Sequence, residues 1–212
     1  MNLSLMRKEY SEFPLHKKDL NPDPFKQFEV WFEDATKAEL IEPNAMSLAT
    51  VSPLGKPTIR TVLLKIYDEK GFVFFSNYES QKAKDIANNP CVALHFAWLP
   101  LQRQLRIEGV IEKISTAESL AYFLSRPRGS QMGAWASNQS EIVSSRSLLE
   151  AKFHEIKSKF MSGQVPLPDF WGGYRVKAER FEFWQGGKDR LHDRFVYEKD
   201  AQNQWEIKRI AP

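Results

Sequence analysis

The stretch AMSLATVSPLGKPTIRTVLLKIYDEKGFVFFSN, residues 45–77, decides the fold class. Its three apolar segments are separated by two turn sequences, Pro53-Leu54-Gly55-Lys56 and Asp68-Glu69-Lys70-Gly71. The period of two within each segment is typical of strands with one buried face, and both turns are short enough for hairpins. The stretch therefore predicts an antiparallel meander of three strands, over residues 45–51, 57–67 and 72–77.

The rest of the chain continues in hairpin-like succession, interrupted by helices. Five more strands are predicted, over residues 91–98, 103–114, 173–183, 190–197 and 204–210. Helices are predicted from Pro24, capped by Asp23, to about Leu40; from Ser80 to Asn89; from Ser115, in a capping box with Glu118, to Ser125; and over the Leu149, Phe153, Ile156 and Phe160 face up to Gly163. Seven or eight strands with a few helices predict a mainly β (α+β) fold, a closed or split antiparallel barrel with helices packed outside.

Length and composition favour one domain. The chain has 212 residues, of which 42% are hydrophobic, with six Trp and fifteen Phe, so a sizeable core is expected without disulfides or metal. Residues 1–20 are polar and basic without a period, and are expected to form a mobile arm. Residues 21–212 are expected to form the single domain.

Charge and cysteine content exclude several classes. A formal charge of +3, from 30 basic and 27 acidic residues, indicates a mixed surface and not a dedicated nucleic-acid binder. One cysteine, Cys91, rules out an internal disulfide and a cysteine-based zinc site and fits a reducing compartment. With neither an apolar run of membrane-spanning length nor an export signal, a cytoplasmic location is expected.

Common catalytic motifs are missing from the sequence. It has no Walker loop, no G-x-G-x-x-G after a strand and no G-x-S-x-G elbow, and its four histidines lack the spacing of a helical metal site. No metal site is therefore predicted. If the protein is an enzyme, an organic cofactor is the natural carrier of its chemistry.

Two groups of residues suit anionic ligands. In the predicted strand Arg190-Leu191-His192-Asp193-Arg194, the side chains of Arg190, His192 and Arg194 would share one face, with Trp184 offering a stacking surface nearby. The alternative is that these charged side chains lie on a solvated outer face of the sheet and bind no ligand. Tyr122 and Arg126 are four apart on a predicted helix, and Ser130 follows in a long polar segment, residues 126–144, predicted to be a loop. This set suits a phosphate monoester, although Arg126 could equally interact with the helix dipole.

Two weaker signals precede these groups. Arg60 and Lys65 are five residues apart, so a regular strand would place them on opposite faces, and a shared site would need a bulge or twist between them. Ser80-Gln81-Lys82 begins a predicted helix whose N-terminal amides could receive a phosphate. Each is more often a solvent-facing feature when it stands alone.

Motifs over nearly the whole chain resemble the pyridoxine (pyridoxamine) 5'-phosphate oxidase family. The resemblance is carried by residues 60–65, Ser125-Arg126-Pro127, residues 130–135, Val165-Pro166-Leu167-Pro168, residues 170–173, the run from Glu182 to Phe195, and the ending Ile210-Ala211-Pro212. It implies the split β-barrel that binds flavin mononucleotide (FMN), assembled as a homodimer with FMN at the subunit interface. The implied reaction converts pyridoxine or pyridoxamine 5'-phosphate to pyridoxal 5'-phosphate, with molecular oxygen as electron acceptor and hydrogen peroxide as product, in vitamin B6 metabolism.

The resemblance also implies site residues. FMN would contact Arg60, Thr61, Val62, Leu63, Leu64, Lys65, Phe75, Ser76, Gln81, Lys82, Gln104, Gln139, Ser140, Trp184 and Arg194, some of them from the second subunit. The substrate phosphate would contact Lys65, Tyr122, Arg126 and Ser130. Arg190 and His192 would lie against the reacting ring and act in catalysis, and Arg7 and Tyr10 would form a lid.

One position departs from the family pattern. Gln81 stands where the family often has an arginine before the lysine, which predicts weaker retention of FMN. Two other functions stay open on sequence grounds. The barrel could belong to another FMN oxidoreductase such as a flavin reductase, or a basic barrel face with aromatic side chains could bind nucleic acid without catalysis.

Overall fold

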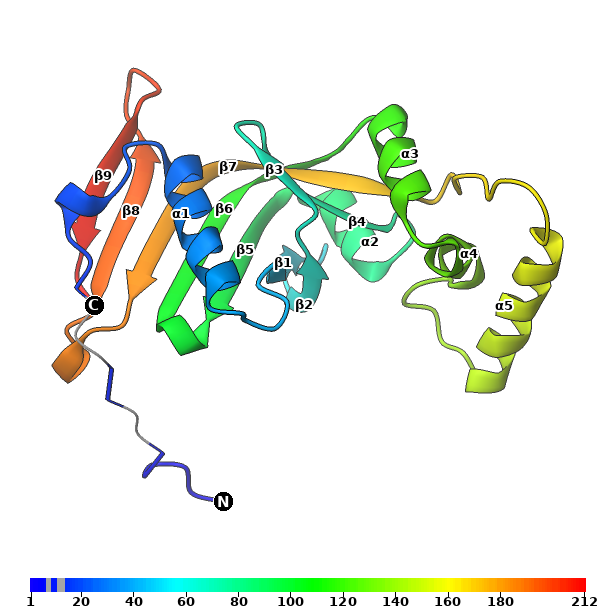
Figure 1. Ribbon diagram of the computed structural model, residues 1–212, viewed down its shortest axis with the longest axis horizontal. Coiled ribbons are helices and arrows are strands. Elements are labelled where there is room, and N and C mark those ends of the chain that lie inside the picture. Colours follow the sequence, from blue (N-terminus) through cyan, green and yellow to red (C-terminus); the bar gives the residue numbers. More distant parts are fainter. Residues whose placement is uncertain (7–8, 11–13) are drawn as a thin grey trace.

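The computed structural model describes residues 1–6, 9–10 and 14–212, and in this part of the chain one curled sheet of nine strands carries helices on its outside (Figure 1). Every strand pairing is antiparallel, and the main path of pairings runs β2-β1-β5-β6-β7-β4-β3. The strands are β1 (Ala45–Val51), β2 (Pro57–Leu63), β3 (Ile66–Asp68), β4 (Gly71–Asn77), β5 (Cys91–Trp98), β6 (Arg103–Lys113), β7 (Trp171–Gln185), β8 (Asp193–Lys199) and β9 (Trp205–Ile210). The mainly β split-barrel fold predicted from the sequence is confirmed.

β7 is the strand at which the sheet divides. It pairs along its length with β6, while residues 171–176 pair on the other side with β4 and residues 180–185 pair with β8. Between these two parts the register with β6 shifts at Glu108/Gly109. A Cβ on Gly109 would lie 2.0 Å from the carbonyl oxygen of Lys177, so only glycine fits this close approach. The bulge bends β7, and its two ends serve different parts of the molecule.

The barrel core is closed by α1 (Pro24–Lys37). As predicted, Asp23 caps the helix by accepting from the Phe25 amide, and Pro24 occupies the first turn. Phe28 and Trp31 are buried on its inner face and contact aromatic side chains of the sheet. The segment before the helix joins the same core through Leu15 and Leu20.

A second, smaller core lies beyond the other end of the barrel. α2 (Gln81–Asn88) packs against β1, and α3 (Thr116–Ser125) begins with the predicted capping box of Ser115 and Glu118. α4 (Arg128–Ala136) and α5 (Arg146–Lys159) follow and pack against each other. Buried side chains of α3, α4, α5 and β7 make up this core: Phe123, Met132, Ala136, Ile156 and Trp171, together with Val165.

Three sequence predictions are wrong in detail. The strand predicted over residues 57–67 is broken after Leu63, which gives nine strands instead of eight. The segment 126–144, predicted to be a loop, contains α4, whose glycines and polar residues mask a buried face at Met132 and Ala136. The strand predicted from Arg190 begins only at Asp193.

The last correction has a backbone cause. Asp189 and Arg190 have φ values of 55° and 66°, in the left-handed region that strands do not use. They belong to a short 3₁₀ turn, η3 (Lys188–Arg190). Arg190, His192 and Arg194 therefore do not form the single strand face that the sequence predicted.

Candidate functional site

A cavity of about 690 Å³ opens between the barrel and the helices α2, α3 and α4. This volume is typical of sites for drug-sized ligands and cofactors. Most of the residues predicted to bind a ligand line it: Arg60, Thr61, Val62, Leu63, Lys65, Phe75, Ser76, Gln81, Lys82, Tyr122, Arg126, Ser130, Gln139 and Ser140. The break after β2 explains how Arg60 and Lys65 reach one cavity, because Lys65 follows the strand and is free of its alternation.

Arg60 lies at the cavity wall beside a buried carboxylate. Its Nη1 donates to Thr50 Oγ1 at 2.7 Å and its Nη2 donates to Thr58 Oγ1 at 2.6 Å. Asp85 of α2 is fully buried and accepts from the hydroxyls of both threonines at 2.8 and 2.9 Å. Burial acts to raise the pKa of Asp85, but the hydrogen bonds from Gln81, Thr50 and Thr58 and the charge of Arg60 lower it. Asp85 therefore stays ionised and fixes the orientation of Arg60.

Lys82 brings a second cation to the same wall. Its Nζ donates to Ser76 Oγ at 3.1 Å, Ser80 Oγ at 3.2 Å and Gln139 Oε1 at 2.8 Å, all neutral acceptors. Burial, and to a lesser degree the charge of Arg60, lower the pKa of Lys82 to about 8. A bound anion would offset both effects. Two cations and serine hydroxyls thus form a site suited to a phosphate group.

Arg126 forms a separate cationic site at the end of α3. Its guanidinium lies over the ring of Trp171 with 4.6 Å between Cζ and the ring centroid. Among the residues that the structure describes, its Nη1 is the one buried side-chain nitrogen or oxygen without a hydrogen-bond partner. Because an unsatisfied buried donor is costly, this atom points to a ligand acceptor.

Aromatic rings connect Arg126 to the middle of the cavity. Phe75 stacks on Tyr122 with a centroid distance of 3.8 Å and on Trp171 at 5.4 Å, and the planes of each pair lie within 16°. Trp171 lines the cavity although the sequence analysis did not select it. Its position next to Gly172-Gly173 gave no separate signal, because a strand tryptophan usually belongs to the core.

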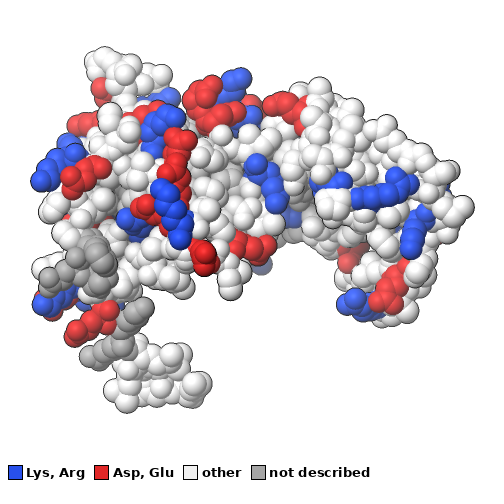
Figure 2. Space-filling view, in the orientation of Figure 1, with Lys and Arg blue, Asp and Glu red and all other residues white. Residues whose placement is uncertain are grey.

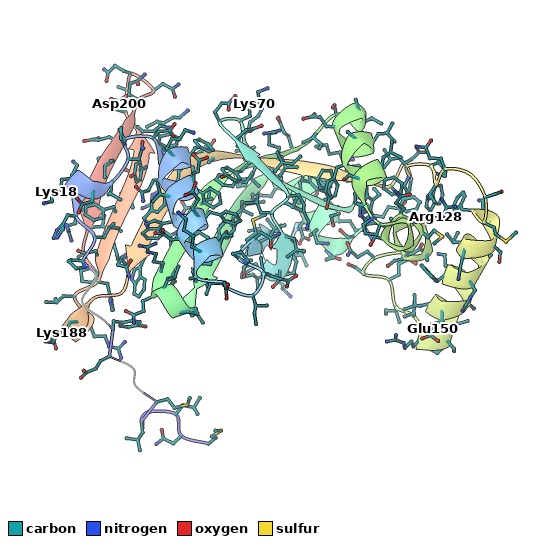
Figure 3. The ribbon with its side chains drawn as sticks, viewed as in Figure 1. Lys18, Lys70, Arg128, Glu150, Lys188 and Asp200 are labelled. Carbon is teal, nitrogen blue, oxygen red and sulfur yellow. The ribbon has the colours of Figure 1, made fainter. Side chains whose placement is uncertain are left out.

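The other predicted site residues gather at the opposite end of the molecule. Gln104, Trp184 and Arg194 line a smaller cavity of about 310 Å³, together with His95, Arg106, Glu182 and Pro212. Figure 3 shows the separation: Arg128, on α4 next to the larger cavity, and Lys188, on the turn that leads to Arg190, lie on opposite sides of the molecule. A single chain therefore does not bring the two groups together.

His192 packs into this second group. Its ring lies 4.6 Å from that of Trp184, and Tyr10 contacts both rings edge-on at 5.4 and 5.8 Å. The Gly187 amide donates to His192 Nδ1 at 3.1 Å, which places the proton of the neutral ring on Nε2. Burial, with a contribution from Arg190, lowers the pKa of His192, so the neutral ring predominates near pH 7.

Two predicted residues fall outside both groups. The side chain of Leu64 is buried in the barrel core and does not line the cavity, which is a correction to its predicted place in the ligand site. Its backbone instead pairs with Asn44, whose carbonyl oxygen accepts from the Leu64 amide at 2.9 Å. Arg7 lies outside the described residues.

Two features are absent from the described part of the chain, residues 1–6, 9–10 and 14–212. No helix there is long and apolar enough to cross a membrane, and no group of three or more His, Cys, Asp or Glu side chains is arranged to hold a metal ion. Figure 2 shows basic and acidic side chains interspersed over the barrel half of the face in view.

Family models match most of the chain. Residues 32–160 match the model described as pyridoxamine 5'-phosphate oxidase, and residues 171–212 match that of the pyridoxine 5'-phosphate oxidase C-terminal dimerisation region. The chain belongs to the pyridoxamine 5'-phosphate oxidase family. The pyridoxine/pyridoxamine 5'-phosphate oxidase of Crocosphaera subtropica is 63% identical over 214 residues, and that of Aliarcobacter butzleri is 61% identical over 212 residues; both alignments cover 100% of both chains.

The fold of one solved structure matches nearly the whole chain. PhzG from Burkholderia lata, in complex with tetrahydrophenazine-1-carboxylic acid, superposes with a TM-score of 0.88 at 26% sequence identity. The superposition covers 94% of this chain and 98% of that one. The family predicted from sequence motifs is confirmed by the two family models and by the relatives above 60% identity.

Proposed function

We infer that the protein is a pyridoxine/pyridoxamine 5'-phosphate oxidase that uses FMN and molecular oxygen to make pyridoxal 5'-phosphate. The observation that carries this inference is the pair of separate cationic sites in one cavity, at Arg60 and Lys82 and at Arg126. Cofactor and substrate each carry one phosphate, so an FMN oxidase of vitamin B6 phosphates needs two such sites. Relatives above 60% identity over the full chain carry the same oxidase name.

The chemistry of the larger cavity fits FMN. Lys82 lacks a carboxylate partner in the described part of the chain, so nothing there offsets the burial and the Arg60 charge that lower its pKa. We assign the FMN phosphate to Arg60, Lys82 and the serine hydroxyl of Ser76, with Gln81, Gln139 and Ser140 beside them. Residues 61–63, Lys65 and Phe75 would border the rest of the cofactor.

The unsatisfied Arg126 Nη1 supports the assignment of the substrate phosphate. We assign this phosphate to Arg126, with the cavity-lining side chains of Lys65, Tyr122 and Ser130. The Trp171 face holds the guanidinium plane, so its N–H fork is oriented before substrate arrives.

The protein is a homodimer, and residues 171–212 match the family's dimerisation region. We propose that Gln104, Trp184, Arg190, His192 and Arg194 of one subunit complete the cavity of the other, because they lie away from the cavity of their own chain. In a twofold-symmetric dimer the same exchange occurs twice and yields two equivalent sites. Tyr10 would belong to the lid, since it already contacts His192 and Trp184, whereas Leu15 and Leu20 are part of the barrel core.

The residues of the chain would act mainly by positioning. Bound FMN supplies the hydride acceptor, and molecular oxygen takes up the electrons as hydrogen peroxide. With its Nδ1 engaged by the Gly187 amide, neutral His192 presents an Nε2–H donor to the substrate oxygen or nitrogen. Arg190 would orient the same substituent, and the phosphate held by Arg126 fixes the far side of the substrate ring.

Purification and an oxygen electrode test this function. We expect a yellow protein that consumes oxygen and releases peroxide with pyridoxine or pyridoxamine 5'-phosphate, and not with the unphosphorylated vitamins. A flavoprotein without this activity would indicate another split-barrel oxidoreductase. A colourless protein that binds single-stranded DNA and takes up no FMN would indicate the nucleic-acid module. A cytoplasmic location also belongs to the proposal, and the lone cysteine supports it.

The affinity for FMN should fall as the pH rises above about 8, the pKa of Lys82 in the ligand-free protein. Below this pH Lys82 is charged before binding; above it, binding must include uptake of a proton. The phosphate is already a dianion above pH 7, so its own titration does not interfere. Kd should therefore rise by up to about tenfold per pH unit, measured as quenching of flavin fluorescence from pH 7 to 9. A Lys82→Met variant should show weaker, pH-independent binding, and a flat profile for the parent protein would contradict the prediction.

Gln81→Arg should tighten FMN binding. Gln81 lines the cavity, and its Nε2 donates to Asp85 Oδ1 at 2.9 Å. An arginine there adds a charge-assisted donor near the proposed phosphate site, which lowers Kd by about tenfold. Asn88→Arg, at the far end of α2, is the matched control for net charge and should leave Kd within about twofold. Equal Kd values for the Gln81→Arg variant and the parent protein would disprove the interpretation of Gln81 as a missing contact.

A further inference from the structure

Glu182 of β7 is a buried carboxylate with an arginine on each side. It is 6% exposed, and its Oε1 accepts from Arg194 Nε at 2.9 Å and from Arg194 Nη2 at 2.6 Å. Its Oε2 accepts from Arg106 Nη2 at 2.6 Å. Because the three residues lie on adjacent strands, β6, β7 and β8, the strand register itself brings them together.

The end of the chain holds the other side of Arg194. Arg194 Nη1 donates to the carbonyl oxygen of Ala211 at 2.8 Å, and Pro212 lines the same small cavity as Arg194 and Trp184. Of the five guanidinium N–H groups, one on each terminal nitrogen is left for a ligand. Arg194 is thus fixed from two directions while part of its fork stays available.

The carboxylates around Arg194 determine which kind of ligand its guanidinium suits. Glu182 offsets its charge, and the wider network repeats the pattern, since Arg180 contacts Glu198 at 2.9 Å and Glu108 at 3.2 Å. At the larger cavity, by contrast, Arg60 lies 3.9 Å from its one carboxylate, Asp85, and Lys82 donates to neutral oxygens. Arg194 therefore acts less as a net cation and more as a directional donor, which suits an uncharged acceptor.

We propose that Glu182 and the carboxy-terminal residues Ala211 and Pro212 are positioning residues that orient Arg194 toward the uncharged ring system of FMN. The proposal rests on the proposed function, in which Arg194 contacts the FMN held by the partner subunit. Trp184, directly opposite Arg194 in the β7–β8 pairing, supplies the apolar surface beside the same ring. In consequence, the last two residues of the chain contribute to the cofactor site.

The first test replaces one carboxylate. Glu182→Gln keeps the shape of the side chain but removes the charge that holds Arg194, and should raise the FMN Kd of the apoprotein by about tenfold. Glu108→Gln is the matched control, because Glu108 contacts Arg106 and Arg180 and makes no contact with Arg194. It should leave Kd within about twofold. Equal weakening by both substitutions would mean that only the charge network as a whole matters, and would overturn the proposal.

A double-substitution cycle tests whether Glu182 acts through Arg194. If it does, Glu182→Gln should cause no further loss of FMN affinity in an Arg194→Met background, and both variants should shift the visible absorption bands of bound flavin in the same direction. Additive losses would overturn the proposal. An Arg194→Met variant with unchanged affinity and unchanged bands would instead refute the placement of Arg194 at FMN, which belongs to the proposed function.

Deletion of Ala211 and Pro212 provides an independent test that leaves Glu182 in place. The truncated protein should remain dimeric by sedimentation, bind FMN about threefold to tenfold more weakly, and show the same band shift as Glu182→Gln. Parental affinity and parental bands in a dimeric truncated protein would exclude the carboxy terminus from the cofactor site. Loss of the dimer would show that these residues serve assembly instead, which also overturns their proposed role.

Discussion

Replacement of Arg190 by methionine is expected to lower kcat by about a thousandfold while FMN affinity stays within about twofold of the parent value. Arg190 lies on the η3 turn beside His192, and in the described part of the chain its side chain makes no hydrogen bond or ion pair. It is therefore free to act on substrate, and the FMN phosphate is assigned to other residues, Arg60 and Lys82, which line the larger cavity. Steady-state oxygen consumption and flavin fluorescence quenching measure the two quantities.

Lys188→Met is the matched control for Arg190→Met, because it removes a cation from the same turn. It should retain nearly full turnover. A loss of FMN affinity as large as the loss of turnover would contradict the role assigned to Arg190, since it would place the guanidinium at the cofactor or in the fold.

Replacement of Arg126 by leucine is expected to raise KM for pyridoxine 5'-phosphate by about a hundredfold. The buried Nη1 without a partner would lose its ligand, and the leucine would leave the Trp171 face without its cation. Because the phosphate is remote from the reacting carbon, kcat should fall less than kcat/KM. Arg126→Lys should recover little, since an ammonium cannot reproduce the stacked, forked geometry.

Arg128→Leu is the matched control for Arg126→Leu. Arg128 is an exposed arginine two residues further on, and it donates to the backbone carbonyl oxygens of Gly163 and Phe160. Arg128→Leu should lower the stability of the fold, because these hydrogen bonds are lost, and should leave KM unaltered. An unchanged KM in the Arg126→Leu protein would contradict the assignment of the substrate phosphate to Arg126.

Local signals predicted the frame of the molecule well. Asp23-Pro24 marked the start of α1, the Ser115–Glu118 capping box marked α3, and the two turn sequences in residues 45–77 separated the first strands. These signals work because a cap or a turn depends on hydrogen bonds among three or four consecutive residues. All of those residues can be read in one short stretch of sequence.

Long-range packing produced the errors. The break between β2 and β3 lets the side chain of Leu64 enter the barrel core, a demand set by distant residues. Likewise, α4 is stabilised by contacts with α5 and not by its own glycine-containing sequence. The left-handed backbone at Asp189 and Arg190 had no glycine to mark it.

In the candidate site, too, local spacing predicted some residues and long-range contacts hid others. Spacing alone grouped Tyr122, Arg126 and Ser130, and all three line one cavity. The family resemblance supplied Gln139 and Ser140, which reach the cavity from a segment without periodicity. Glu182 and Asp85, the buried carboxylates beside Arg194 and Arg60, were missed, because a buried acid is recognisable only once its partners are placed.

Arg126 lines the larger cavity of its own chain and Arg190 does not, so the two arginines of one site would come from different subunits. This arrangement has a genetic consequence. Two different null alleles, one disabling each arginine, should complement each other when both polypeptides are made in the same cell. In a hybrid assembly one pocket inherits both lesions and the other inherits neither. Random pairing then restores about a quarter of normal output from parents that have almost none.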